Sequence, residues 1–273
     1  MSKLVSFFLL AGWLLCGPAV WAHTTILIPQ AGKNGRQVIK VLHFHPVTGA
    51  GLMGIRLGVE DRRDLKGLAA IYLVHEGEEK KLDAIAVPDY YTVRGERRAT
   101  YSIPVDKKSG FFRPGDYIIV VKHRPHWKEN EGLYRQKVAK YYLNLHGLMT
   151  DWPRRVLKKM PEIIPLVPPF NVTAGSLFRA EAVNENGRPL PHARINIEYL
   201  NYPLGATALA ATAAPFLPAE LADTIVFTDS AGGFAFVPPR KGLWTLTLVD
   251  GDQQQTIGGR ELQFDSSLSI MVK

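Results

Sequence analysis

Cysteine is nearly absent from this 273-residue chain, which contains only Cys16. That residue lies in an N-terminal stretch that we expect to be removed, so the mature chain has no thiol. A chain without thiols excludes disulfides, thiolate metal sites and cysteine nucleophiles, and it suits an oxidising compartment. Long apolar runs are equally scarce. The run Leu4–Leu15 is too short to span a bilayer as a stop-transfer helix.

Signatures of catalysis are missing as well. The sequence has no Gly-x-Ser-x-Gly elbow, no His-Glu-x-x-His motif and no glycine-rich phosphate loop. Its net charge of +8 comes from scattered basic residues, which favours a solvated basic surface over a nucleic-acid interface. We therefore expect a protein that is not an enzyme and does not bind nucleic acid.

The first 22 residues have the organisation of a signal peptide. Lys3 supplies a positive start, the apolar run follows, and Ala22 stands at the cleavage position. Lipid attachment at Cys16 is the alternative, but Leu15 before it is larger than lipoprotein processing prefers. The pattern predicts export to the periplasm and a mature chain that begins with His23.

The mature chain predicts an all-β protein made of two β-sandwich domains. Short β-branched or aromatic runs, each bounded by turn residues, recur along its length. We expect strands at 25–28, 37–44, 69–74, 99–103, 117–122, 137–145, 178–184, 193–199, 224–228, 234–237, 242–248 and 262–272, and a short helix near 218–222. The proline-rich segment 151–170 predicts a semi-rigid linker between an N-terminal domain, residues 23–150, and an Ig-like or transthyretin-like C-terminal domain, residues 171–273.

Five of the eight histidines fall in three clusters of the first domain, and these are the candidate metal ligands. After cleavage, His23 would offer an α-amine and an imidazole to one metal ion. His43 and His45 stand at i and i+2 of a predicted strand, which places both on one face. His123 and His126 follow another strand. Each cluster alone is also compatible with an ordinary solvent-facing or packed histidine, but together they favour capture of a transition metal.

Imidazole ligands without thiolates suit borderline divalent ions, so we expect Ni²⁺ or Co²⁺, with Cu²⁺ or Zn²⁺ as alternatives. The remaining histidines, His75, His146 and His192, stand near strand ends or turns without histidine neighbours and are expected to be incidental.

Motifs along nearly the whole mature chain resemble the periplasmic component of bacterial cobalt/nickel ABC-type (ECF-type) uptake systems, the NikM-like/CbiK-like domains. Their order and spacing carry the resemblance, since each motif alone is common. They are His23–Pro29, Phe44–Pro46, Arg113–Tyr117, His126–Trp127, Asp151–Trp152, Glu162–Pro165, Asn186–Leu190, Thr228–Phe234 and Gly242–Trp244.

The resemblance implies a metal-binding protein that supplies Ni²⁺ or Co²⁺, as the ion or a small chelate, to an inner-membrane uptake transporter. Of the candidate ligands, it matches His23 and His45. Two other functions stay open. A copper oxidase of the lytic polysaccharide monooxygenase type would use His23 with His43, His45 or His126. A non-catalytic carbohydrate-binding or adhesion module would leave the histidines without a role.

Overall fold

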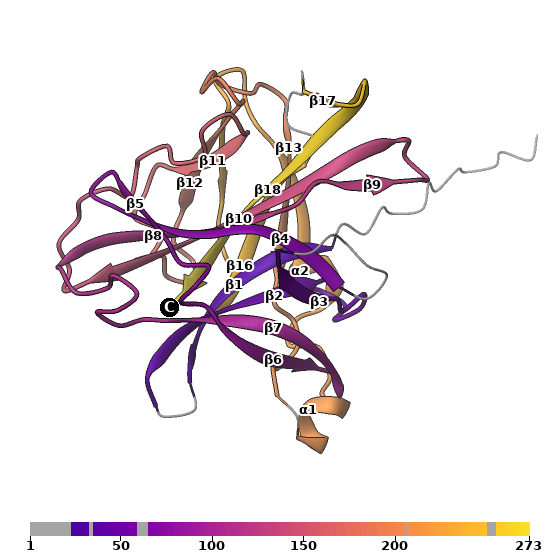
Figure 1. The fold of residues 1–273 in the computed structure, drawn as a ribbon. Coiled ribbons are helices and arrows are strands. Elements are labelled where there is room, and N and C mark those ends of the chain that lie inside the picture. The colour runs from indigo at the N-terminus through magenta and orange to yellow at the C-terminus, as the bar shows by residue number, and fades with distance from the viewer. Residues whose placement is uncertain (1–22, 33–34, 59–64, 206, 250–254) are drawn as a thin grey trace, which may run out of the picture.

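A computed structural model describes residues 23–32, 35–58, 65–205, 207–249 and 255–273 (Figure 1). The predicted signal peptide lies outside these ranges. Regular structure in the described residues is almost entirely strand, which confirms the predicted all-β sandwich class. The helices α1 (Ala208–Thr212) and α2 (Ala219–Ala222) are short. Among the described residues, no helix has the length and apolar character needed to cross a membrane.

The strands form three sheets. The first has four strands in the order β1 (Thr24–Ala31), β2 (Gln37–Phe44), β7 (Glu96–Pro104) and β6 (Val87–Val93). The second and largest sheet runs β14 (Asp223–Phe227), β13 (Arg194–Tyr199), β16 (Gly242–Leu248), β18 (Arg260–Val272), β10 (Leu133–Leu145), β8 (Gly115–His123), β4 (Leu65–His75) and β3 (Gly54–Leu57). Three short strands extend it: β17 (Thr256–Ile257), β5 (Glu78–Lys81) and β9 (His126–Lys128). The third sheet contains β11 (Glu162–Pro165), β12 (Phe178–Val183) and β15 (Gly233–Phe236).

The large sheet is buried on both faces because alternate residues of its central strands enter different cores. Along β8, Tyr117 and Ile119 pack in a cluster with Leu27 of the four-stranded sheet. Their neighbours Ile118 and Val120 belong to the cluster that holds the three-stranded sheet. Side chains of a strand alternate between faces, so a near-continuous apolar run such as β8 is what a doubly covered strand requires.

Strand β18 joins the two halves of the chain. It pairs in parallel with β10 on one side and antiparallel with β16 on the other, so the large sheet crosses the predicted domain boundary (Figure 1). The segment 151–170, predicted to be an extended linker, also contains a regular strand. This strand, β11, pairs with β12 because Ile163 and Ile164 turn a proline-flanked stretch into a buried strand.

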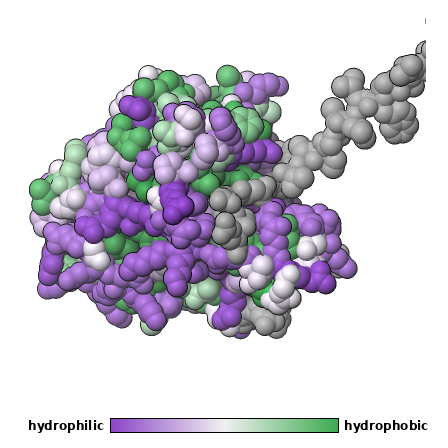
Figure 2. All heavy atoms as spheres, turned by 90° about the horizontal axis from the view of Figure 1, so that it is seen from above, coloured by the Kyte–Doolittle hydropathy of each residue, from purple (hydrophilic) through white to green (hydrophobic). Residues whose placement is uncertain are grey.

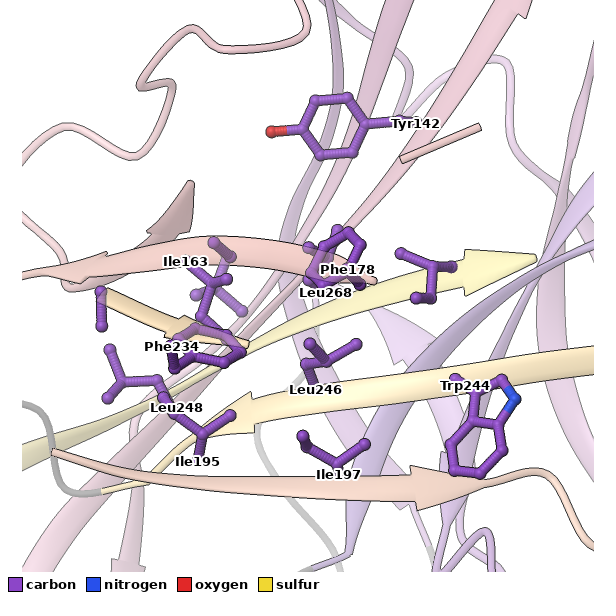
Figure 3. Packing of buried hydrophobic residues seen from close by; sticks show 14 of the residues in the cluster. Tyr142, Ile163, Phe178, Ile195, Ile197, Phe234, Trp244, Leu246, Leu248 and Leu268 are labelled. Carbon is purple, nitrogen blue, oxygen red and sulfur yellow. The ribbon is translucent and has the colours of Figure 1, made fainter. Parts of the chain in front are cut away.

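The core under the three-stranded sheet is shown in Figure 3. Phe178, Phe234 and Ile163 from β12, β15 and β11 face Leu246 and Leu268 across the gap between the sheets. Near this core, the fully buried Lys140 ammonium contacts the Glu162 carboxylate, which ties β10 to β11. The face of the molecule seen in Figure 2 is largely hydrophilic, with small separate apolar patches, as expected for a sandwich whose apolar faces are turned inward.

Candidate metal centre

The N-terminal strand brings the candidate site together. Strand β1 pairs with β2 so that Thr25 stands opposite His43, and it also lies against β10 and β18 (Figure 1). Two side chains of β18 fix it there. Ser267 Oγ donates to the carbonyl of Thr25 at 3.0 Å, and Leu27 N donates to Ser269 Oγ at 3.1 Å. The start of the described chain is therefore held inside the molecule, among strands from both halves.

Three of the five predicted ligands are connected through ring contacts. The ring centres of His23 and His43 are 6.1 Å apart, and those of His43 and His123 are 5.3 Å apart. Imidazoles that share a metal at a metal–nitrogen distance of about 2.1 Å place their ring centres roughly 4.5–6.5 Å apart. Both observed separations fall in that range. His43 and His123 are almost fully buried, which is unusual for paired histidines without a carboxylate between them.

A threonine hydroxyl bridges the two buried rings. Thr25 Oγ1 lies 3.0 Å from His43 Nδ1 and 2.8 Å from His123 Nε2. The other nitrogen of each ring, His43 Nε2 and His123 Nδ1, has no hydrogen-bond partner among the described residues although it is buried. Buried polar atoms are almost always paired, so two orphaned nitrogens on neighbouring rings indicate a place for a ligand.

His45 lies one residue beyond the end of the strand that carries His43. Strand β2 ends at Phe44, and His45 begins the following turn, where its backbone N–H donates to Ala50 O at 3.0 Å. Its Nε2 is 3.6 Å from Glu198 Oε1, and Thr24 Oγ1 donates to the other Glu198 oxygen at 3.1 Å. His45 therefore contacts a carboxyl group that spacing in the sequence does not reveal.

His126 opens β9, opposite Arg135 of β10, and is buried. Its charge, when present, lowers the pKa of His123, which places the two rings in the same electrostatic neighbourhood. Of the three remaining histidines, His75 stacks on Tyr117 at 4.1 Å and bonds to Asp116 O at 2.9 Å, a structural role. His146 and His192 are exposed.

Burial keeps the site's imidazoles uncharged near neutral pH. It lowers the pKa of His23 and of His45 to about 4, and that of His126 to about 3. The pKa values of His43 and His123 also lie well below the ordinary value, chiefly through burial and then through the positive charge of Lys137. Neutral imidazole is the form that binds metals, so ring lone pairs are available without competition from protons.

Glu198 is shifted in the opposite direction. Burial raises the pKa of its carboxyl group to about 8, and the charge of Asp223 adds to the effect. Near neutral pH, the 3.6 Å contact with His45 therefore joins two uncharged groups and is not an ion pair.

Positive charge surrounds the cluster. Lys137 is buried, donates to the carbonyl oxygen of His23 and lies 3.5 Å from Asp265 Oδ2. Burial lowers the pKa of this lysine to about 8, although Asp265 opposes the shift. The charges of Lys66 and Lys128 also lower the pKa of His126. With Thr247 and Ser267, Lys137 and Asp265 line a narrow cleft beside His23.

One glycine permits the position of the His23 ring. A Cβ on Gly51 would stand 1.9 Å from His23 Nε2, and the backbone of Gly51 has a positive φ of +64°. Sequence reasoning missed Gly51, Thr25, Lys137 and Glu198. Each belongs to a common residue type, and its only signal is proximity to His23, His43 or His45 in the folded chain.

Within the described residues, no three or more His, Cys, Asp or Glu side chains have the spacing of a formed metal site. The rings of His23, His43 and His123 lie in contact, but Thr25 occupies one nitrogen of each of the two buried rings and His45 lies beside Glu198.

Comparisons with other proteins identify a family and little more. A family model described as a domain of unknown function, DUF4198, matches residues 20–250. Curated proteins of established function give no match. The predicted resemblance to nickel and cobalt uptake components thus stays a prediction.

Similar solved structures include two bacterial ice-binding adhesins. One, of 1.5 MDa, is 7% identical with a TM-score of 0.21, covering 92% of this chain and 64% of that chain. The other, a Ca²⁺-stabilised adhesin of an Antarctic bacterium, is 9% identical with a TM-score of 0.22, covering 92% and 49%. Trypsin-activated alpha-2-macroglobulin from Escherichia coli is 12% identical with a TM-score of 0.20, covering 93% and 16%. This chain thus spans less than two thirds of each of these proteins.

Proposed function

The DUF4198 family model, a domain of unknown function, matches most of the chain, so the chain belongs to that family. We propose that the protein captures a divalent transition metal. The observation that carries the proposal is the pair of buried, contacting rings of His43 and His123, each with an orphaned nitrogen. The neutral state of these rings also supports metal binding, because a neutral imidazole has a lone pair that can bind a metal ion.

His23 supplies the anchor in this proposal. Signal-peptidase cleavage before it would convert its backbone amide into an α-amine on the same residue as an imidazole already 6.1 Å, centre to centre, from His43. An amine and two imidazoles form a nitrogen-only ligand set, which suits Ni²⁺ and Co²⁺ as well as Cu²⁺ and Zn²⁺. Lys137, which donates to the His23 carbonyl, would hold this new terminus in place.

The role proposed for the protein is non-catalytic and periplasmic. It would bind the ion or a small chelate of it and supply it to an inner-membrane uptake transporter, as the resemblance noted in the sequence implies. Burial of the site among three strands favours retention of one ion over rapid exchange at a surface.

Calorimetric titration of the exported, processed protein tests the proposal. We expect one Ni²⁺ or Co²⁺ bound per chain, with mass spectrometry confirming that the chain begins at His23. A His23→Ala/His43→Ala variant should bind more than about 100-fold more weakly, because losing a ligand exceeds the 10–100-fold typical of residues that only orient one.

Two further variants complete the design. His146→Asn/His192→Asn alters two exposed histidines whose positive φ angles suit asparagine, and it should bind like the wild type. A variant with one glycine inserted before His23 separates the amine from the imidazole and should bind weakly. Equal affinity in the wild type and the His23/His43 variant would overturn the proposal.

A further inference from the structure

The Thr25 hydroxyl links the protonation patterns of the two buried histidines. Each neutral ring carries one N–H and the hydroxyl carries one O–H, which makes three protons for two hydrogen bonds. Each contact, 3.0 Å to His43 Nδ1 and 2.8 Å to His123 Nε2, needs one proton between its two atoms. The third proton therefore points away from the bridge.

Three arrangements satisfy this count. If the hydroxyl donates to His43, both rings carry their proton on Nε2. If it donates to His123, both carry it on Nδ1. If both rings donate to the oxygen, the hydroxyl proton needs another acceptor, and none is found for buried Thr25 among the described residues. The two rings consequently share one tautomer, and only one of the two orphaned nitrogens has a lone pair.

The position of His23 decides which tautomer accepts a metal. Its ring contacts His43, and the ring of His43 in turn contacts His123. Of the two orphaned nitrogens, His43 Nε2 belongs to the ring next to His23, so a metal anchored on His23 selects the arrangement in which that atom has the lone pair. His43 then donates from Nδ1 to Thr25, Thr25 donates to His123 Nε2, and His123 carries its proton on the orphaned Nδ1.

We propose that Thr25 is a positioning residue that makes His43 a metal ligand and His123 a hydrogen-bond donor to an oxygen carried by the metal. This inference rests on the proposed function. It narrows the ligand to a divalent ion that arrives with an oxygen acceptor, either water or the carboxylate of a small chelator.

The charges around the site favour the same class of ligand. Lys137, Lys66 and Lys128 place positive charge near the rings, which opposes the approach of a bare dication. An oxygen ligand on the metal, above all an anionic one, offsets that repulsion and supplies the acceptor that the His123 N–H lacks.

Long-range ¹H–¹⁵N NMR of the processed protein tests the inference, because it distinguishes Nδ1–H, Nε2–H and metal-bound nitrogen in each ring. In the metal-free protein we expect His43 and His123 to show the same tautomer. With Zn²⁺, a diamagnetic probe, we expect His43 to be bound through Nε2 and His123 to carry Nδ1–H. A further shift of that proton when citrate is added would identify a carboxylate acceptor, and no shift would identify water.

Variants separate positioning from folding. Thr25→Val should let the His123 tautomer differ from that of His43 and should weaken Zn²⁺ binding about 10–100-fold, whereas Thr25→Ser should preserve both. Thr247→Val is the matched control. It also removes a buried threonine hydroxyl beside the cleft, one with no partner among the described residues, and it should leave both rings unchanged.

The outcomes distinguish this inference from the function on which it rests. Zn²⁺ bound through both His43 Nε2 and His123 Nδ1 would overturn the inference and leave metal capture intact. Different tautomers in the metal-free wild type would also overturn it. If no metal binds but the two metal-free tautomers match, the coupling through Thr25 stands and the proposed function fails.

Discussion

The His23 imidazole lies directly against the backbone of Gly51, closer than any side chain at that position would allow. The Cβ of an alanine there would stand 1.9 Å from Nε2 and within 2.8 Å of two ring carbons. Gly51 thus makes room for the ring that anchors the candidate site. Its residue type, not its hydrogen bonds, gives it that role.

We expect Gly51→Ala to displace the His23 ring and weaken metal binding by more than tenfold. The substitution also introduces strain, since a non-glycine residue at positive φ destabilises by about 1 kcal/mol. Gly132→Ala is the control. Gly132 has a φ of +71°, but a Cβ there would meet nothing within 4 Å, so this variant carries the strain alone. Calorimetric titration and urea unfolding of both variants check this. Equal metal affinity in the two would contradict it.

Strand β18 is the element on which both halves of the chain depend. It lies between β10 and β16, and its Ser267 and Ser269 hold β1, the strand that carries Thr25 and directly follows His23. The candidate site in the first half is therefore assembled partly by the last strand of the second. The two domains predicted on either side of residues 151–170 therefore share one sheet.

A fragment ending at residue 150 should accordingly fold poorly. It would expose the β18-facing edge of β10 and the half of the core that Trp244, Leu246 and Leu268 fill. We expect the fragment 23–150 to lack a cooperative urea transition by circular dichroism, while the chain 23–273 unfolds in one. A stable, cooperative fragment would instead establish residues 23–150 as an independent domain.

The protein as a whole should be most stable near pH 6.5 when metal is absent. The five site histidines have lower pKa values folded than the ordinary 6.5, so the unfolded chain binds more protons below that pH. Their stabilising contribution is present above pH 6.5 and is lost as the pH falls toward 4. The buried pair His43 and His123 alone can contribute a slope of roughly 2.7 kcal/mol per pH unit.

Glu198 acts in the reverse sense. Its folded pKa of about 8 exceeds the ordinary 4.5, so its contribution is present at low pH and is lost as the pH rises through 8. Urea unfolding from pH 4.5 to 8.5 measures both limbs. Glu198→Gln should flatten the alkaline limb and steepen the acidic one, because Glu198 opposes the histidines between pH 4.5 and 6.5. His43→Gln/His123→Gln should flatten the acidic limb. An unfolding free energy that stays constant between pH 6.5 and 5 would contradict this account.

Much of the fold is readable from local pattern. The twelve predicted strands all correspond to observed ones, and β2 and β16 have the predicted bounds, because β-branched alternation between turn residues is a local property. Six strands of the described residues were not predicted, and three of them have weak local signals; the six are β3, β5, β6, β9, β11 and β17. β5 is made of exposed charged residues, β9 has three residues, and β11 is flanked by prolines, so each depends on the strand that it pairs with.

The sequence by itself determined the all-β class and the three histidine clusters, since these follow from alternation and spacing along the chain, and it predicts an export signal. Only the tertiary structure decided which atoms meet. It placed the His23 ring on Gly51, joined His43 to His123 through Thr25, and turned His45 toward Glu198. Those contacts depend on the pairing of β18 with β10 and on the packing of β1 against both strands. Long-range strand pairing of this kind has no local signal in a sequence. His23, which follows the predicted cleavage site, is one end of a row of rings whose other two members, His43 and His123, are buried.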